Sequence, residues 1–318
     1  MGNALHTTLG RLAVNSKLLA IKAYGAVVRL LPARTLVIEG IGSMAGVLSM
    51  FLHAGQWGPI GRFAGHIGYE RTKRRFILRY FLRKGKDLAW ELSGYELPLD
   101  PTDYAAIEGS ELLEQSLRAG KGAILIGAHY GPSLYLHTLH SLSADVRVLV
   151  APGRLDYWDR FESLGAARLQ RRMFSFLQSR SLAAGKEERS LLSHLRAGGA
   201  VFMDIDTPGP RKEEQTVPFL GARMAPHLFP FELSLKYRSP VFFCLFEEDR
   251  KRPYRFRICP CSPFSAASDG FREYIAFVEK KILSCPFMWS LVPHFFDMFA
   301  TAAPDMPSCP AKRAPADQ

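Results

Sequence analysis

Hydrophobic and polar positions change their pattern about a third of the way along the chain. Up to about residue 100, apolar residues recur at helical spacing among many basic ones. The clearest case is residues 71–86, where positions 76, 77, 80 and 81 share one side of a predicted helix. From about residue 104, short β-rich runs alternate with helical runs. The predicted strands are 123–126, 146–150, 200–206, 241–246 and 254–258, and the predicted helices are 105–118, 187–196 and 271–283.

Strands separated by helices predict an α/β fold with a mostly parallel central sheet flanked by helices. We therefore expect a helical, membrane-associating N-terminal region over residues 1–100 and an α/β domain over residues 101–300. The Pro- and Ala-rich residues 301–318 are expected to form a flexible tail.

The N-terminal region has the character of a membrane-surface segment. Its first 34 residues place lysines and arginines among leucines, as in helices that bind anionic lipid at the interface. Residues 35–53 are apolar but contain Glu39 and His53, and they are barely as long as the roughly 20 residues that a membrane span needs. We interpret them as a membrane-seated or buried hairpin, with a true span as the alternative.

The net charge indicates the class of binding partner, and the cysteine content indicates the redox compartment. A formal net charge of +11 favours an anionic partner, such as an acidic carrier protein, an anionic membrane surface or a nucleic acid. No nucleic-acid-binding motif accompanies the basic stretches, so we expect no nucleic-acid partner. The five cysteines are odd in number and show no metal-ligand spacing, which favours reduced thiols in a cytosolic compartment.

The strongest candidate for a catalytic residue is His129, in the stretch "ILIGAHYGPSLYLHTL". It follows the predicted strand 123–126, and ligands of open α/β sheets collect at the carboxyl ends of strands. Gly127 and Gly131 permit tight turns on either side, and Pro132 suits the first turn of a following helix. A purely structural histidine is the alternative.

Two further carboxylates, Asp204 and Asp206, end another predicted strand. They could orient a base, bind a cation or cap a turn. His137 and His140 lie three positions apart on the predicted helix after His129, but no third ligand accompanies them. We therefore expect no metal site.

The motifs in order resemble one family. The succession "GAHYG", "LLSHLRAGGAVFMDID", "VPFLGARMAP", "KYRSPVFFCLFEED" and "YRFRICP", closed by "YIAFVEKKILSCPFMWSLVPHFF", is similar to the bacterial late acyltransferases of lipid A biosynthesis (the lauroyl and myristoyl acyltransferases). These belong to the lysophospholipid acyltransferase superfamily. The resemblance covers roughly residues 10–298, and the collinear order carries it, because each motif is short.

The resemblance implies transfer of a fatty acyl group from a thioester, on acyl carrier protein or coenzyme A, to a hydroxyl of a lipid or glycolipid. It implies no cofactor, and a location at the cytoplasmic face of the inner membrane. His129 matches the family's general base, and imidazole, with a reference pKa of about 6.5, suits that role. Asp204 matches an aspartate of the pocket. Gly131, Gly221 and Arg223 are the expected substrate-binding residues, although the family's "FFG-x-x-A" motif is only partly matched around Gly221.

The chain departs from the family's His-x4-Asp/Glu motif, because Leu134 stands where the acid is expected. Loss of the orienting carboxylate of a serine-protease triad costs roughly 10⁴ in rate. Three explanations remain open. Asp204 or Asp206 could reach His129 and rebuild the pair, the chemistry could be less demanding, or the protein could be an inactive lipid- or carrier-binding relative.

Overall fold

The computed structural model describes residues 34–96, 99–142, 145–150, 181–183, 187–209 and 216–301. The first 33 residues, predicted to form a basic amphipathic segment, lie outside the described residues. Nearly all of the predicted tail does as well.

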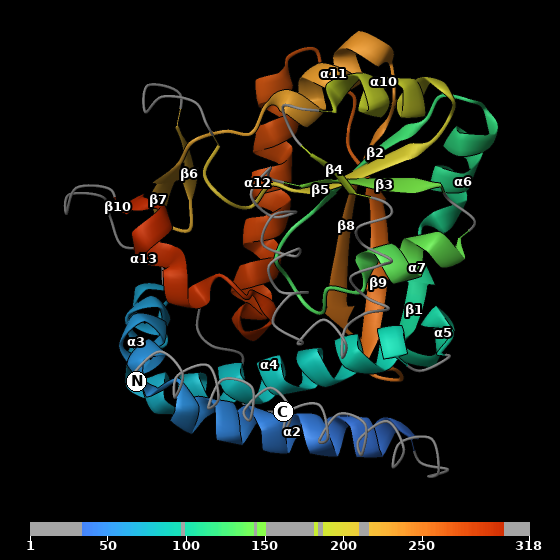
Figure 1. The fold of residues 1–318 in the computed structure, drawn as a ribbon. Coiled ribbons are helices and arrows are strands. Elements are labelled where there is room, and N and C mark those ends of the chain that lie inside the picture. Colours follow the sequence, from blue (N-terminus) through green and yellow to red (C-terminus); the bar gives the residue numbers. More distant parts are fainter. Residues whose placement is uncertain are drawn as a thin grey trace, which may run out of the picture.

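The described residues form a central sheet of seven strands in the order β1–β9–β8–β2–β5–β3–β4 (Figure 1). The strands are β1 (Ala105–Glu108), β2 (Ala123–Gly127), β3 (Val146–Val150), β4 (Ser181–Ala183), β5 (Ala200–Asp204), β8 (Val241–Glu248) and β9 (Tyr254–Pro260). Neighbouring strands are parallel except for the antiparallel pair β8 and β9. The predicted α/β fold with a mostly parallel sheet is confirmed.

The central strands form because their sequences are apolar throughout. All five residues of β2 are buried, and so are the first four of β5, as expected for parallel strands covered on both faces. In β9 buried residues alternate with partly exposed ones, which is the pattern of a strand with one wetter face.

One predicted helix is partly wrong. Residues 105–118 were expected to be helical throughout, but the first four form β1 and only Ser110–Arg118 form helix α6. Gly109, at φ +82°, separates them. Strand β1 pairs in parallel with β9, and this pairing outweighs the helical preference of the local sequence. The other two predicted helices are confirmed as α10 (Glu188–Arg196) and α12 (Ala267–Ser284).

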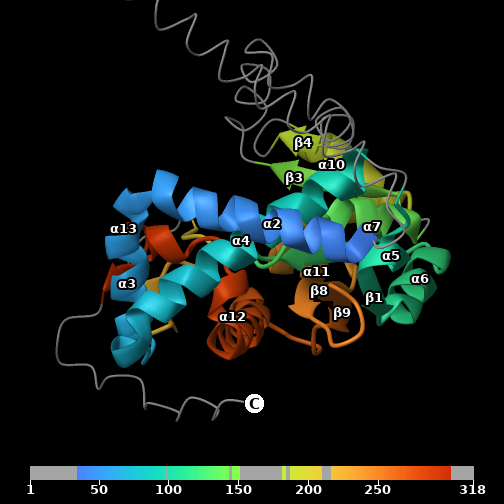
Figure 2. The ribbon, with the colours of Figure 1, turned by 90° about the horizontal axis from the view of Figure 1, so that it is seen from below.

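The apolar N-terminal run is a single helix, α2 (Arg34–Leu52), so the predicted hairpin is wrong. It lies side by side with the basic helix α4 (Lys73–Glu96) in Figures 1 and 2. Glycines explain this close contact: a Cβ atom on Gly85 of α4 would overlap backbone atoms of Gly42 and Gly46 on α2. Gly42, Gly46 and Gly85 therefore form the contact surface between the two helices.

The side of α2 that faces away from α4 is apolar and exposed. Leu36, Met44, Leu48, Phe51 and Leu52 are each at least 60% exposed. Among the described residues, α2 is the one helix that is long and apolar enough to cross a membrane, and only 17% of its apolar window is buried.

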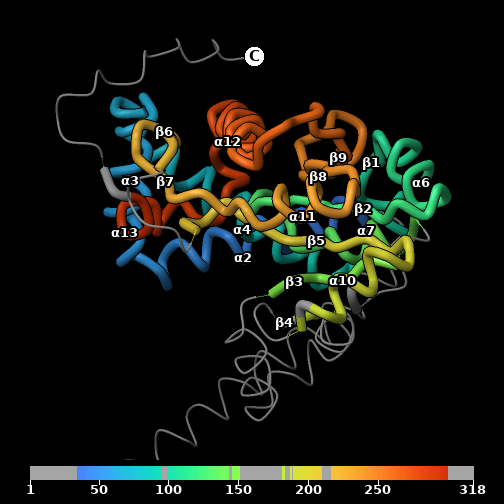
Figure 3. The backbone as a smooth tube through the Cα atoms, turned by 90° about the horizontal axis from the view of Figure 1, so that it is seen from above, coloured from blue at the N-terminus to red at the C-terminus, as the bar shows by residue number. Residues whose placement is uncertain are grey.

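The remaining elements frame the sheet. In Figure 3 a small antiparallel sheet of β6 (Val217–Phe219), β7 (Ala222–Met224) and β10 (Ala300–Thr301) lies at one end of the molecule, beside α3 (Trp57–His66) and α13 (Phe295–Met298). Strand β1 and helix α6 lie at the other end. Helix α7 (Tyr135–Ser141) follows β2 after a loop, and α11 (Phe229–Tyr237) precedes β8. The remaining described helices are the short segments α5 (Pro101–Tyr104), η1 (Ala54–Gln56), η2 (Glu70–Thr72), η5 (Pro286–Met288) and η6 (Val292–His294).

Candidate functional site

His129 lies in the loop between β2 and α7, at the carboxyl end of a central strand. Gly131 adopts φ +83°, and its N–H donates to the carbonyl of Met288 at 2.8 Å. The backbone N–H of Ser290 donates to the carbonyl of His129, also at 2.8 Å. Residues 288–290 therefore run beside the loop and fix the backbone around His129.

The His129 ring is paired with a carboxylate from the loop that follows the neighbouring strand, β5. Its Nδ1 lies 2.7 Å from Oδ1 of Asp206, and its backbone N–H donates to Oδ2 of the same carboxylate at 2.9 Å. Strands β2 and β5 are parallel neighbours, with Gly127 opposite Asp204, so their ends deliver both residues to one edge of the sheet. A carboxylate on Nδ1 favours the tautomer with the proton there, and in that tautomer Nε2 is the basic nitrogen of the ring.

Asp206 is held firmly in place. Its side chain is fully buried, and Oδ2 also accepts the indole N–H of Trp289 at 2.8 Å. Trp289 is itself fully buried. Two N–H donors to one oxygen and the imidazole on the other satisfy the carboxylate, which a buried charge requires. The Pro286–Trp289 segment, singled out in the sequence as a closing motif, therefore holds the acid that orients His129.

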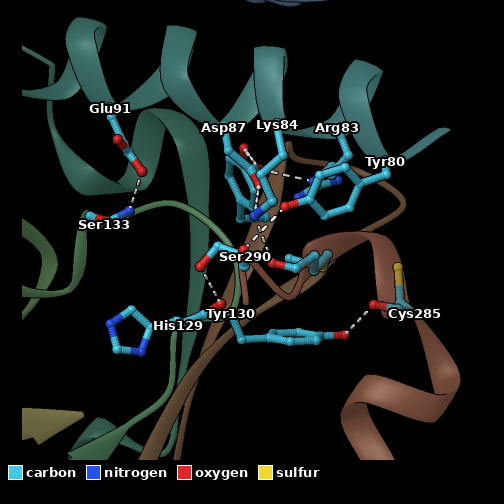
Figure 4. Close-up of polar contacts among 12 residues, drawn as sticks. Tyr80, Arg83, Lys84, Asp87, Glu91, His129, Tyr130, Ser133, Cys285 and Ser290 are labelled. Carbon is cyan, nitrogen blue, oxygen red and sulfur yellow. Dashed lines mark hydrogen bonds and ion pairs between the residues drawn. The ribbon is translucent and has the colours of Figure 1, made fainter. Parts of the chain in front are cut away.

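A cavity of about 210 Å³ opens beside His129. The side chain of His129 is 36% exposed, so the ring is reachable from this space. The cavity is lined by Lys84, Asp87, Leu88, Glu91, His129, Gly131, Ser133, Tyr135, Asp204 and Ser290. Figure 4 shows Lys84, Asp87 and Glu91 projecting from α4 toward the loop that carries His129. The wall opposite the sheet is therefore polar and comes from the N-terminal helical region.

A charged network ties this wall together. Asp87 is almost fully buried and accepts from Nε of Arg83 at 2.9 Å and from the hydroxyl of Tyr254 at 2.7 Å. Lys84 Nζ lies 3.4 Å from the other oxygen of Asp87 and donates to the carbonyl of Met288 at 3.0 Å. Burial lowers the pKa of Lys84, although the charge of Asp87 opposes this effect.

Glu91 holds the end of the loop. Its Oε1 accepts the backbone N–H of Ser133 at 2.6 Å. Burial raises the pKa of Glu91 to about 7, while the hydrogen bond from Ser133 acts in the opposite direction. The carboxyl group is thus poised to change charge near neutral pH, as residues of functional sites often are.

Leu134 stands where the family acid was expected, and it is fully buried. Its side chain fills the space above Gly94 of α4, because a Cβ atom on Gly94 would lie 2.6 Å from Leu134 Cδ2. Leu134 is therefore a packing residue between the loop and α4, and the acid beside His129 comes from a different strand.

The structure brings some of the sequence-predicted site residues together and separates others. Asp204 and Gly131 line the cavity beside His129. Gly221 and Arg223 do not line this cavity. Gly221 lies in the turn between β6 and β7, at φ +74°, and Arg223 on β7 donates to the Thr216 hydroxyl at 2.6 Å.

The helix histidines have structural partners. Nδ1 of His137 lies 2.8 Å from the Tyr104 hydroxyl, and burial lowers the pKa of His137. In the described ranges, no cluster of three or more His, Cys, Asp or Glu side chains could hold a metal ion.

Sequence reasoning missed the residues that α4 contributes, Lys84, Asp87 and Glu91. Their signal was weak but present: "RKGKDLAWE" places them three and four positions apart, on one face of a helix. Nothing in the local sequence says which part of the fold that face meets.

A scan of the chain against protein-family models finds no match, and a search of curated proteins finds none.

Proposed function

We propose that this protein is an acyltransferase that moves a fatty acyl group from a thioester to a hydroxyl of a lipid or glycolipid. The observation that carries the proposal is the pair formed by His129 Nδ1 and Asp206 Oδ1 at 2.7 Å, beside a cavity that reaches the ring. The order of the motifs, which resembles the late acyltransferases of lipid A biosynthesis, supports the reaction class.

The pair supplies what the reaction needs. Nε2 of His129 removes the proton from the acceptor hydroxyl as its oxygen attacks the thioester carbon, and Asp206 stabilises the imidazolium that forms. Collapse of the tetrahedral intermediate breaks the carbon–sulfur bond, and the imidazolium returns the proton to the departing thiolate. Because the alcohol attacks directly, the enzyme needs no nucleophile of its own.

The exposed apolar face of α2 supports a location at the membrane. Helix α2 packs on α4, and α4 lines the His129 cavity, so an apolar helix that enters or lies on a bilayer would hold the site close to lipid. Basic side chains in the exposed first turns of α4 suit an anionic lipid surface or an acidic acyl carrier. We place the protein at the cytoplasmic face of the inner membrane.

The alternative of an inactive relative depends on Leu134. The contact between Asp206 and His129 weighs against it, because Asp206 provides the orientation that the motif acid would have provided.

The test uses the full chain, lauroyl-coenzyme A or lauroyl acyl carrier protein as donor, and total membrane lipid as acceptor. We expect the wild-type protein to form an acylated lipid, detected by mass spectrometry. His129→Ala should reduce the rate at least about 10²-fold, the usual contribution of a general base. His140→Ala, at an exposed position on α7, is the matched control. An unchanged rate in His129→Ala would overturn the proposal.

A further inference from the structure

We propose that Lys84 is the oxyanion-binding residue of this site, donating an N–H to the carbonyl oxygen of the thioester as negative charge develops there. The inference rests on the proposed acyl transfer and adds a catalytic residue from α4, outside the α/β part of the chain.

The backbone donors around His129 are already engaged. The N–H of His129 donates to Asp206, that of Tyr130 to the Ala128 carbonyl at 2.6 Å, and that of Gly131 to the Met288 carbonyl. The N–H of Ser133 donates to Glu91, and Pro132 has none. Within the described loop from 129 to 133, no backbone N–H remains for a ligand, so we assign the oxyanion donor to a side chain of the cavity wall.

Lys84 is held beside the loop that carries His129. The Met288 carbonyl accepts both the Gly131 N–H at 2.8 Å and Lys84 Nζ at 3.0 Å. One shared acceptor therefore places the ammonium directly beside the loop of His129. Lys84 and His129 also line the same cavity.

An ammonium has three N–H donors, and two of them have acceptors here. Met288 takes one and Asp87 lies 3.4 Å away for another. Among the described residues the third has no hydrogen-bond acceptor, and the nearest ring, that of Tyr80, has its centroid 5.9 Å from Nζ, so we assign this donor to a ligand in the cavity. A donor oriented in advance needs no reorganisation during the reaction, which is the main source of electrostatic catalysis.

The charges around Lys84 leave it able to stabilise an anion. Asp87 is shared with Arg83 and Tyr254, and Glu91, with its raised pKa, is largely neutral below about pH 7. A cation in a partly dry cavity interacts more strongly with a new negative charge than it would in water.

The proposed transfer passes through a tetrahedral intermediate. The acceptor oxygen loses its proton to Nε2 of His129 and bonds to the thioester carbon. The electron pair of the carbonyl π bond moves to oxygen, which accepts a hydrogen bond from Lys84. That pair then re-forms the carbonyl, the carbon–sulfur bond breaks, and the thiolate takes the proton from His129. Lys84 keeps its own proton throughout.

The first test is kinetic. Lys84→Met removes the charge and nearly preserves the volume, and Lys84→Gln is a second variant in case the first does not fold. Loss of one oxyanion donor lowers kcat by about 10²–10³-fold, so we expect that fall in kcat with little change in KM for lauroyl-coenzyme A. Lys86→Met is the matched control, because Lys86 lies on the same helix but pairs with Glu39 of α2 at 3.2 Å.

The second test separates catalysis from a structural role. Two lauroyl-coenzyme A analogues are compared by calorimetry: a thioether without the carbonyl, and a trifluoromethyl ketone that mimics the tetrahedral intermediate. Lys84→Met should bind the thioether like wild type and bind the ketone at least about 10²-fold more weakly. Equal losses for both analogues, or no loss for the ketone, would overturn the assignment.

The two proposals fail differently. If His129→Ala is inactive while Lys84→Met keeps wild-type kcat and ketone affinity, only the role of Lys84 is wrong. If His129→Ala remains fully active, the proposed function itself is wrong, and the inference about Lys84 is withdrawn with it.

Discussion

The Nδ1 atom of His129 lies 2.7 Å from Oδ1 of Asp206, although 77 positions separate the two residues in the chain. The same carboxylate accepts the backbone N–H of His129 and the indole N–H of Trp289. His129 has no acid five positions later in the chain. Its carboxylate partner is instead the fully buried Asp206, which follows the adjacent strand β5.

Leu134→Glu tests whether an acid restored at the family's motif position could serve His129, or whether Asp206 has taken over that role. Leu134 is fully buried against α4, so a carboxylate there would lose its hydration. We expect the variant to be less stable by at least about 2 kcal/mol in urea unfolding, without a gain in turnover. Leu112→Glu, at a 46% exposed leucine on α6, is the control and should change stability little. A stable Leu134→Glu variant with raised turnover would show that Asp206 does not replace the motif acid.

Glu91 makes stability depend on pH. Its pKa is raised from 4.5 to about 7 by burial, so the folded chain holds this proton more tightly than the unfolded chain. Its contribution is therefore fully present below about pH 4.5 and is lost as pH rises through about 7, by up to about 3 kcal/mol.

Glu91→Gln keeps an oxygen for the Ser133 N–H but cannot ionise. We expect the free energy of unfolding of Glu91→Gln minus that of wild type to be more positive at about pH 8 than at about pH 5. Glu114→Gln, at an exposed position on α6, should show no such dependence. An equal difference at both pH values would mean that Glu91 titrates normally.

The exposed face of α2 predicts binding to lipid vesicles. Leu48 and Leu52 are 60% and 71% exposed, and burial of a leucine side chain stabilises by about 1.5–3 kcal/mol. Leu48→Asp combined with Leu52→Asp should weaken co-sedimentation with vesicles that contain anionic phospholipid by at least about tenfold. Leu283→Asp, at a 39% exposed leucine on α12, should bind like wild type. Undiminished binding of the double variant would show that the exposed face of α2 does not attach the protein to the membrane.

The sequence predicts those strands whose apolar character is local. Residues 123–126 and 241–246 are continuous apolar runs, and both form central strands. Residues 105–108 form a strand only because β9 lies beside them, which no local pattern reveals. The apolar run at 35–53 suggested a hairpin because it contains Glu39 and His53 and is barely as long as a span, whereas its Gly42 and Gly46 pack against α4.

The site was predictable where it depends on local sequence and not where it depends on long-range packing. The rule that strand ends collect ligands places His129, Asp204 and Asp206 at one edge. It does not say which carboxylate reaches the ring, because two acids two positions apart end the same run. Lys84 and Glu91 could not be predicted, since their position depends on how α4 crosses that edge.

The most direct test of the central claim is the acyl-transfer rate of Asp206→Asn. The variant keeps an oxygen for the Trp289 and His129 N–H groups but presents an amide N–H to Nδ1, which moves the ring proton to Nε2 and removes the base. We predict a rate about 10⁴-fold below wild type, comparable with the same change in a serine-protease triad, and a folded protein by circular dichroism. A rate within about tenfold of wild type would contradict the account.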